Sequence, residues 1–508
     1  MLLSLAASAE SRINCKKPYS NLEEHSIDSI KKSCSNVAEI LNTFESFDVG
    51  IGFAGEYVEN PASAFGHTFL IFIDKENFLQ SQTISYLADT KSESNFFRYA
   101  FKGSFGGFQG VFKNVPLYKL EHVYKDIESR DLWVYEFDRN VLSKEKLLLA
   151  IIEEENSEYL PYYFFNYNCT SALRKLISKS VIDQVKVKKR FLDYPASLIV
   201  DLKAQISKVH SFTNKESLLY IQRKKISDSE FEKIRQALER RKPIELKQNS
   251  NVDNYLETLY DYYSFKVHTV KEHKELANIF PPLKFKTKNK ELKDPTFQPR
   301  SVAISRGELN GIKTNKFEFR PTYKSKAREQ NHQNNRSELE LLKLSVIHTN
   351  NSFTFSNATL FDLENQSHYE WPSYILSKRT SLFFDRYCND GCSATENIKL
   401  NYYKGISKIY DVFGIASFMG PSVINLWSQN KVMLLASFSI NSWIQYKKIL
   451  LEVDTVFHDS FDRFKEFRFK SSLSYNFDSY QVSFEHNIND MRNVKNVKES
   501  LVGFKVYF

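Results

Sequence analysis

The sequence predicts an α+β fold in the N-terminal part, a helical connector, and a C-terminal antiparallel β-barrel. Residues 68–73 form an apolar run typical of a buried strand, whereas Leu173, Leu176 and Ile177 share one face of a helical pattern. Four prolines, Pro281, Pro282, Pro295 and Pro299, indicate a linker. Beyond about residue 300 the apolar period changes to two, which is the period of strands.

Two residues of the N-terminal part are candidates for chemistry. His67 opens the apolar run, and Cys169 stands at the start of the helical pattern. A thiolate at a helix N-terminus is stabilised by unpaired backbone N–H groups, and a nearby imidazole can accept the thiol proton. The pair therefore predicts acyl transfer through a thioester, with the two side chains a few ångströms apart. Either residue alone would more often be structural.

Further motifs stand in a fixed order around this pair. They are residues 103–112 (GSFGGFQGVF), Tyr124, residues 128–135 (ESRDLWVY), and residues 162–165 (YYFF), which precede Asn168-Cys169. This run, over about residues 47–200, resembles the periplasmic domain of the Lnb-type lipoprotein N-acyltransferases. The resemblance implies Cys169 as nucleophile and His67 as general base. It also implies Gly66, Glu128 and Arg130 as structural positions of the family pattern.

A more distant resemblance concerns the order of the two residues. A histidine on a strand followed by Asn-Cys on a helix is similar to the circularly permuted papain-like (NlpC-like) enzymes. These include relatives of lecithin-retinol acyltransferase and some peptidoglycan amidases. In ordinary papain-like enzymes the cysteine precedes the histidine, so the order here favours a permuted papain-like catalytic domain.

A third group that orients the imidazole is expected from the logic of a catalytic triad. Glu56, Ser63, Asn166 and Asn168 are local candidates for an orienting or oxyanion role, and the sequence does not choose among them. Backbone N–H groups at the start of the 170–178 helix are expected to stabilise the oxyanion. We expect no cofactor and no metal.

The five cysteines support the choice of Cys169. Cys388 and Cys392 flank a short turn-rich loop and are candidates for a small disulfide ring, and Cys15 and Cys34 are candidates for a second disulfide. Cys169 is then the free thiol. A metal half-site at Cys388 and Cys392 is the alternative, but no second Cys/His pair lies near it in the sequence.

The N-terminus predicts export. Residues 1–9 contain a short apolar stretch that ends in Ala7-Ser8-Ala9, a small-x-small pattern typical of a signal peptide, although no basic region precedes it. The cysteine nearest this point, Cys15, does not follow it directly, so lipid attachment is not indicated. The sequence contains no run of about eighteen apolar residues, so no transmembrane helix is predicted. The net charge of +9 is dispersed, which argues against nucleic-acid binding.

The remaining sequence divides into helical and strand-forming regions. We expect a helical segment over residues 10–46, a catalytic thiol domain over 47–200, a helical connector over 201–296 and a barrel over 297–508. In the connector, Phe231, Ile234 and Leu238 show helical spacing within 227–242, and 252–265 reads as a second helix.

The barrel is predicted from alternation and from the end of the chain. Apolar residues alternate with polar ones at Phe467, Phe469, Leu473 and Tyr475, at Tyr480, Val482 and Phe484, and at Ile398, Leu400 and Tyr402. The chain closes on an aromatic residue, Phe508, which resembles the C-terminal signal of outer-membrane barrels. Aromatics expected to form girdles are Phe383, Phe384, Tyr387, Trp427, Trp443, Tyr446 and Phe457. About ten to twelve strands, an even number, are predicted, and a soluble sandwich is the alternative.

These observations predict a thiol-dependent acyltransferase of the bacterial cell envelope. Its barrel would lie in the outer membrane and its catalytic domain would face the periplasm. The resemblance implies transfer of an acyl chain to the α-amine of lipoprotein N-termini, with a lipoprotein or a phospholipid as acyl donor. We expect a monomer. The alternatives are a peptidoglycan amidopeptidase and, without catalysis, an outer-membrane channel with an inactive periplasmic domain.

Overall fold

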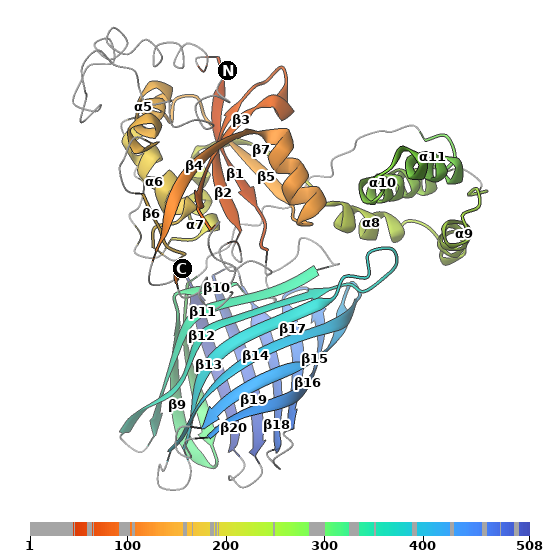
Figure 1. Cartoon of the computed structure of the whole chain (residues 1–508). Coiled ribbons are helices and arrows are strands. Elements are labelled where there is room, and N and C mark those ends of the chain that lie inside the picture. Colours follow the sequence, from red (N-terminus) through yellow and green to blue (C-terminus); the bar gives the residue numbers. More distant parts are fainter. Residues whose placement is uncertain are drawn as a thin grey trace. The chain divides into compact units, whose positions relative to one another are not determined.

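The structure is a computed structural model of the 508-residue chain. It describes residues 44, 46–57, 63, 66–90, 102–103, 107–155, 160–164, 166–182, 187, 190, 193–246, 249–283, 300–324, 335–349, 352–388, 394–426, 431–459, 465–477, 479–491 and 497–508. The chain divides into two compact units, Met1–Thr296 and Phe297–Phe508 (Figure 1). The predicted signal peptide lies outside the described residues, as does nearly all of the predicted 10–46 helix.

The first unit contains a seven-stranded sheet in which every described pairing is antiparallel. The strand order is β6-β4-β3-β2-β1-β5-β7. The strands are β1 (Asp48–Ala54), β2 (His67–Ile73), β3 (Gln82–Ala88), β4 (Phe108–Pro116), β5 (Leu132–Phe137), β6 (Pro161–Tyr162) and β7 (Ile206–Phe212). Strand β7 corrects the prediction of an all-helical 201–296 region. Its backbone pairs with β5 at the sheet edge, a long-range contact that local spacing does not reveal.

Each face of this sheet has its own core, because successive residues of a strand point to opposite faces. Leu70 and Phe72 of β2 pack on one face with Leu173 and other residues of the helices α5 (Lys144–Glu155), α6 (Cys169–Ser180) and α7 (Pro195–Asp201). Phe69 and Ile71 pack on the other face, against α4 (Leu117–Glu121) and the π-helical turn η6 (His122–Ile127). The central strand β2 therefore presents alternate residues to two different environments.

Four helices follow β7 and are called here the helical arm, Lys215–Ile279. They are α8 (Lys215–Arg223), α9 (Asp228–Glu239), α10 (Ser250–Lys266) and α11 (Val270–Ile279). Ser227 and Glu230 form a capping box at the start of α9, which explains why the helix begins there. Within the described residues, no helix is both long and apolar enough to cross a membrane.

The second unit is a closed antiparallel barrel of twelve strands, which confirms the predicted barrel and its even strand number. Its strands are β8 (Ser301–Leu309), β9 (Ile312–Arg320), β11 (Asn335–Thr349), β12 (Ser352–Ser367), β13 (Ser377–Cys388), β14 (Ala394–Ile409), β15 (Phe413–Leu426), β16 (Lys431–Tyr446), β17 (Ile449–Asp459), β18 (Lys465–Asn476), β19 (Tyr480–Met491) and β20 (Val497–Tyr507). The short β10 (Thr322–Lys324) continues β9 after one residue. Closure comes from the pairing of β9 with β11 and of β20 with β8.

On neighbouring strands of the barrel, apolar residues form an outward face and polar or charged residues form the lumen face. Leu473, Tyr475, Val482 and Phe484 are each more than 40% exposed, and register places Leu473 opposite Phe484 and Tyr475 opposite Val482. On the alternate positions, Arg468 donates to Asp385 on β13, and Gln481 donates to Asn476. This arrangement is that of a membrane barrel, and the closed sheet excludes the soluble sandwich.

Two predicted girdle aromatics lie on the lumen side instead. Trp443 is 7% exposed and donates from Nε1 to Gln366 at 3.2 Å. Phe383 lines the lumen cavity beneath the Arg468 guanidinium, which is 5.1 Å from its ring centroid. Both predictions are wrong because a position near a strand end does not determine whether the side chain faces the lipid or the lumen. Tyr446 is 62% exposed at the end of β16, as a girdle residue is expected to be, whereas Trp427 and the side chain of Tyr387 lie outside the described part.

Candidate functional site

Helix α6 begins at Cys169 because Asn168 caps it. The Asn168 Oδ1 atom accepts from the backbone N–H of Thr170 at 3.0 Å and of Ser171 at 3.2 Å. The Ser171 hydroxyl in turn accepts from the Asn168 N–H at 2.7 Å, which completes a capping box. The Asn168 Nδ2 atom donates to the carbonyls of Phe164 and Asp193. The Asn168 side chain is thus committed to holding the helix, which argues against an orienting role toward His67.

The cap also determines which N–H groups remain for an oxyanion. The N–H groups of Thr170 and Ser171 are bound by Asn168 Oδ1, and the Ala172 N–H donates to the Asn168 carbonyl at 3.0 Å. Within the described contacts of this first turn, the N–H of Cys169 has no acceptor. The expectation of several helix-start donors is therefore reduced to this single backbone group.

A buried free thiol lies at this helix start. Cys169 is 2% exposed, and its sulfur accepts from the Thr68 hydroxyl at 3.8 Å. The Thr170 hydroxyl lies 3.8 Å from the same sulfur and 3.1 Å from the Thr68 hydroxyl. Thr68 and Thr170 therefore surround the sulfur with two hydroxyl groups that sequence reasoning did not single out. Their only sequence signal is that each is the neighbour of a predicted catalytic residue.

His67 lies at the beginning of β2 on the opposite face from Thr68. It pairs with Ala54 of β1, and its ring centroid lies 6.3 Å from those of both Phe69 and Tyr124. Its Nε2 atom is buried and has no hydrogen-bond partner among the described residues. Burial, together with the Arg130 charge, lowers the pKa of His67 to about 3, while the Glu128 charge opposes this shift. The imidazole is therefore neutral near pH 7, as a proton acceptor must be.

Within the described residues, no hydrogen bond joins His67 to Cys169. Strand alternation explains this, since Thr68 occupies the face that α6 covers. His67 is the first residue of β2, so its side chain lies where the strand ends and the two faces of the sheet meet. The predicted close approach of ring and sulfur stays a prediction.

Tyr124 links the surroundings of the two groups. The Arg130 guanidinium carbon lies 4.7 Å from the centroid of the Tyr124 ring. Burial raises the pKa of Tyr124 above its ordinary range; Arg130 opposes the rise, and the charges of Glu128 and Cys169 add to it. Tyr124 is therefore a protonated hydroxyl within electrostatic range of Cys169 and in ring contact range of His67. Sequence reasoning included it in a motif without giving it a role.

The family-pattern residues hold this end of the sheet together. Arg130 donates from Nε to the Gly55 carbonyl at 2.6 Å, from Nη2 to the Ala54 carbonyl at 3.2 Å, and from Nη1 to Glu128 at 2.6 Å. Gly66 has a φ of +97°, and an added Cβ would lie 2.7 Å from the Ala54 carbonyl oxygen. Only glycine fits there without strain, and this fixes the entry of the chain into His67.

The other candidate third groups lie around the same strand ends. The backbone carbonyl of Ser63 accepts from the N–H groups of Tyr57 and Gly66, which closes the loop before His67. Glu56 follows β1 by two residues. Asn166 is exposed. The structure does not select one of them as the orienting group.

An ion-pair network around Arg174, in the second turn of α6, holds this helix in place. Arg174 donates from Nε and Nη2 to the two carboxylate oxygens of Asp193, at 2.6 and 2.8 Å, and from Nη1 to Asp201 at 2.7 Å. The carbonyl of the same Asp193 accepts from Asn168. One residue therefore anchors both the helix body and its cap, and thereby positions Cys169.

No disulfide is present among the described residues. Cys15, Cys34, Cys392 and the side chain of Cys388 lie outside them, so the predicted pairings fall outside the described part. Across the described residues, no group of three or more His, Cys, Asp or Glu side chains could hold a metal ion.

Comparison with known proteins places the first unit in a family context. Residues 37–205 match the family of the Lnb N-terminal periplasmic domain. No curated protein matches the chain. Among solved structures, the KdgM porin in complex with disordered oligogalacturonate is 10% identical, has a TM-score of 0.25, and is aligned over 41% of this chain and 99% of its own. An anion-selective porin from Comamonas acidovorans is 7% identical, with a TM-score of 0.21 and coverage of 41% and 97%. The β domain of the Bordetella autotransporter BrkA is 6% identical, with a TM-score of 0.24 and coverage of 41% and 99%.

The family match and the barrel together establish the location of the chain. The matched family is a periplasmic domain, and the second unit is a closed barrel with an apolar exterior and a polar lumen. The chain is an outer-membrane protein with a periplasmic domain, as predicted.

Proposed function

We propose that this protein is a thiol-dependent acyltransferase that acts on lipoprotein N-termini at the periplasmic side of the outer membrane. The observation that carries the proposal is the buried free thiol of Cys169 on the first residue of a capped helix. A neutral imidazole and a protonated tyrosine lie at the same end of the sheet, in a region that matches the Lnb periplasmic domain.

The proposed reaction proceeds through a thioester. His67 takes the thiol proton, and the Cys169 sulfur attacks the ester carbonyl of the acyl donor. The Cys169 N–H and the Tyr124 hydroxyl stabilise the oxyanion. When the intermediate collapses, the C–O bond breaks and His67 returns its proton to the departing glycerol oxygen. The α-amine of the lipoprotein cysteine then attacks the thioester, which forms an amide and releases the thiol.

The mechanism includes a rotation of the His67 ring from the Phe69 face toward the sulfur. Apo geometry of catalytic groups is often loose and tightens when substrate binds. A permuted papain-like arrangement, with the histidine strand before the cysteine helix, is part of this proposal.

Mass spectrometry of lipoprotein N-termini tests the proposal directly. Cells that produce the full chain are compared with cells that produce Cys169→Ser, His67→Gln, or the control Ser178→Ala. The described hydrogen bond of the Ser178 hydroxyl is to the carbonyl of Lys175, on the exposed side of α6. We expect N-acylated termini with the wild type and the control only. Fragment masses separate the donors, since transfer within a lipoprotein keeps its mass and transfer from a phospholipid adds one acyl chain. N-acylation that persists in Cys169→Ser would reject the proposal.

The peptidoglycan amidopeptidase remains a second candidate because a thioester can also form from an amide. Purified protein incubated with muropeptides would then release new amino groups, and Cys169→Ser would release none. Substrate turnover in this assay, without N-acylated lipoproteins in cells, would favour the peptidase.

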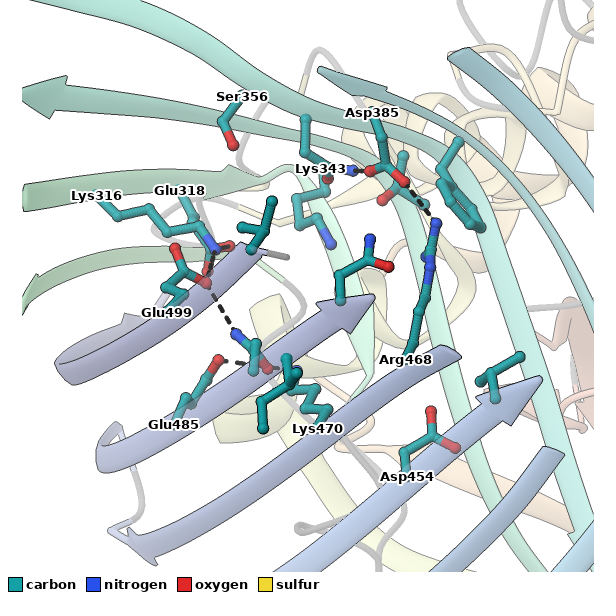
Figure 2. A pocket seen from close by; sticks show the side chains of 18 of the residues that line it. Lys316, Glu318, Lys343, Ser356, Asp385, Asp454, Arg468, Lys470, Glu485 and Glu499 are labelled. Atoms are coloured by element: carbon teal, nitrogen blue, oxygen red, sulfur yellow. Dashed lines mark hydrogen bonds and ion pairs between the residues drawn. The ribbon is translucent and has the colours of Figure 1, made fainter. Parts of the chain in front are cut away.

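The described lumen argues against the channel alternative. Lys399 on β14 binds Glu466 on β18 at 2.7 Å, and neither side chain is exposed. Arg379 on β13 binds Asp454 on β17 at 3.1 Å, and Gln366 on β12 donates to Asn441 on β16 at 2.8 Å. Because these strands are not neighbours, the bonds cross the lumen. A cavity of about 520 Å³ in the barrel is lined by apolar residues and by charged ones such as Lys316, Glu485 and Arg468 (Figure 2). Its lining also includes Leu309, Asn310 and Ile312 at the β8–β9 turn.

A further inference from the structure

The turn Glu128–Asp131 connects the helical arm to the candidate site. Asp131 is 8% exposed, and its Oδ1 atom accepts from both the backbone N–H and the Nδ2 of Asn214, each at 2.9 Å. Asn214 is the N-cap of α8, since its Oδ1 accepts from the Ser217 N–H at 2.8 Å. One side chain therefore joins the first helix of the arm to the turn.

Neighbouring residues reinforce this joint. Glu216, in the first turn of α8, accepts a hydrogen bond from the side chain of Ser129, which has a φ of +52°. Lys215 binds Asp126 of η6 at 3.3 Å, and its ammonium lies 5.3 Å from the ring centroid of Phe265 in α10. The arm therefore contacts both the turn and the helix that carries Tyr124.

The same turn also holds the groups around His67. Arg130, between Ser129 and Asp131, binds the carbonyls of Gly55 and Ala54 and lies over the Tyr124 ring. Ala54 is the register partner of His67. A displacement of Asp131 would therefore move Arg130, and with it the charge that faces His67 and Tyr124.

We propose that the helical arm Lys215–Ile279 controls the reactivity of Cys169 through the contact between Asn214 and Asp131. Asp131 is a positioning residue in this scheme, because it acts through Arg130 and Tyr124. The inference rests on the proposed reactivity of Cys169.

Alkylation of Cys169 in the full chain tests this coupling. The rate of reaction with iodoacetamide is measured against pH from the mass of the peptide that contains Cys169. Asp131→Ala removes the acceptor, whereas Asp131→Asn keeps one acceptor oxygen. Ser227→Ala removes the cap of α9 and serves as the control, since it loosens the arm away from the turn.

We expect Asp131→Ala to change the alkylation rate by about 2- to 30-fold and to displace its pH profile, the range that coupling between sites produces. Asp131→Asn should restore most of the wild-type profile, and Ser227→Ala should retain it. If Asp131→Ala does not fold, Asn214→Ser is used, because serine still caps α8 but removes the Nδ2 donor, one of the two bonds to Asp131, so that a smaller change in the same direction is expected.

Two results would overturn the inference. One is a wild-type profile in the variant that breaks the contact, and the other is an equal change in Ser227→Ala. Alkylation reports the thiol whether or not acyl transfer occurs. Acyl transfer retained in Cys169→Ser would therefore reject the proposed function and leave this measurement interpretable.

Discussion

The Thr68 hydroxyl lies 3.8 Å from the Cys169 sulfur, whereas His67, the residue before it on β2, turns its ring to the other face of the sheet. Two consecutive residues of β2 thus place their side chains on opposite faces of the sheet at the candidate site. The hydroxyl contact is described directly, whereas the approach of the imidazole to the sulfur stays a prediction. Thr68 therefore becomes a residue to test beside the predicted pair.

Thr68→Val is expected to reduce the alkylation rate of Cys169 at pH 7. The substitution keeps the β-branched shape and removes the donor to the sulfur. A hydrogen bond to a charged group contributes about 1.5–3 kcal/mol, so loss of this bond to a thiolate predicts roughly a tenfold decrease or more. The control is Thr83→Val on β3, whose hydroxyl donates to the Val115 carbonyl and not to the thiol. Equal rates in Thr68→Val and wild type would contradict the assigned contact.

His67 is expected to make the sheet less stable at acid pH. Its folded pKa of about 3 lies below its ordinary 6.5, so the unfolded state takes up a proton that the folded state does not. Stability is therefore lost as pH falls from about 6.5 toward 3, by up to about 1.4 kcal/mol per pH unit, and His67 contributes no change above that window. His67→Gln lacks this titration.

Hydrogen exchange of peptides from β2 at pH 7 and pH 5 measures this effect. Protection in the wild type should fall more steeply than in His67→Gln, because only the wild type gains the proton on opening. The same pH dependence in both proteins would show that His67 is not a buried neutral group.

Leu473→Arg is expected to impair barrel assembly. Leu473 is 49% exposed on the outer face of β18 and lies opposite Phe484, so a charge there faces lipid. The cost near the middle of a membrane is about 2–4 kcal/mol. Ser472→Thr, on the lumen side of the same strand, should be tolerated. Heat-modifiable gel mobility of membrane fractions distinguishes folded from unfolded barrel, and equal folding of the two variants would argue against a lipid-facing band.

The wild-type barrel is expected to conduct no steady current in planar bilayers. Lys399 and Glu466 cross the lumen, and Arg468 binds both Glu466 and Asp385. Removing the first two as Lys399→Ala with Glu466→Ala should raise the conductance, because it removes one of the described crossings of the lumen and leaves neither of these two charges unpaired. Lys404→Ala, an exposed position on the same strand, is the control. Steady conductance of the wild type would instead favour the channel.

The sequence by itself determined those features that repeat over short distances. The alternation at Phe467 to Tyr475 and at Tyr480 to Phe484 predicted the barrel and its lipid-facing side. The spacing of Leu173, Leu176 and Ile177 predicted that a helix follows Cys169, and the order of motifs around it predicted the family of the first unit. These patterns are local, because strand and helix periods are properties of neighbouring residues.

Only the tertiary structure decided which groups meet. In the structure, Trp443 and Phe383 lie in the lumen, and residues 206–212 form a strand of the sheet. The Asn168 side chain caps α6. The tertiary structure also brought Thr68 into contact with the thiol, and brought the arm to the turn at Asp131. Each of these outcomes depends on strand register and on contacts between distant segments, and a one-residue change of register would reverse the face of every side chain.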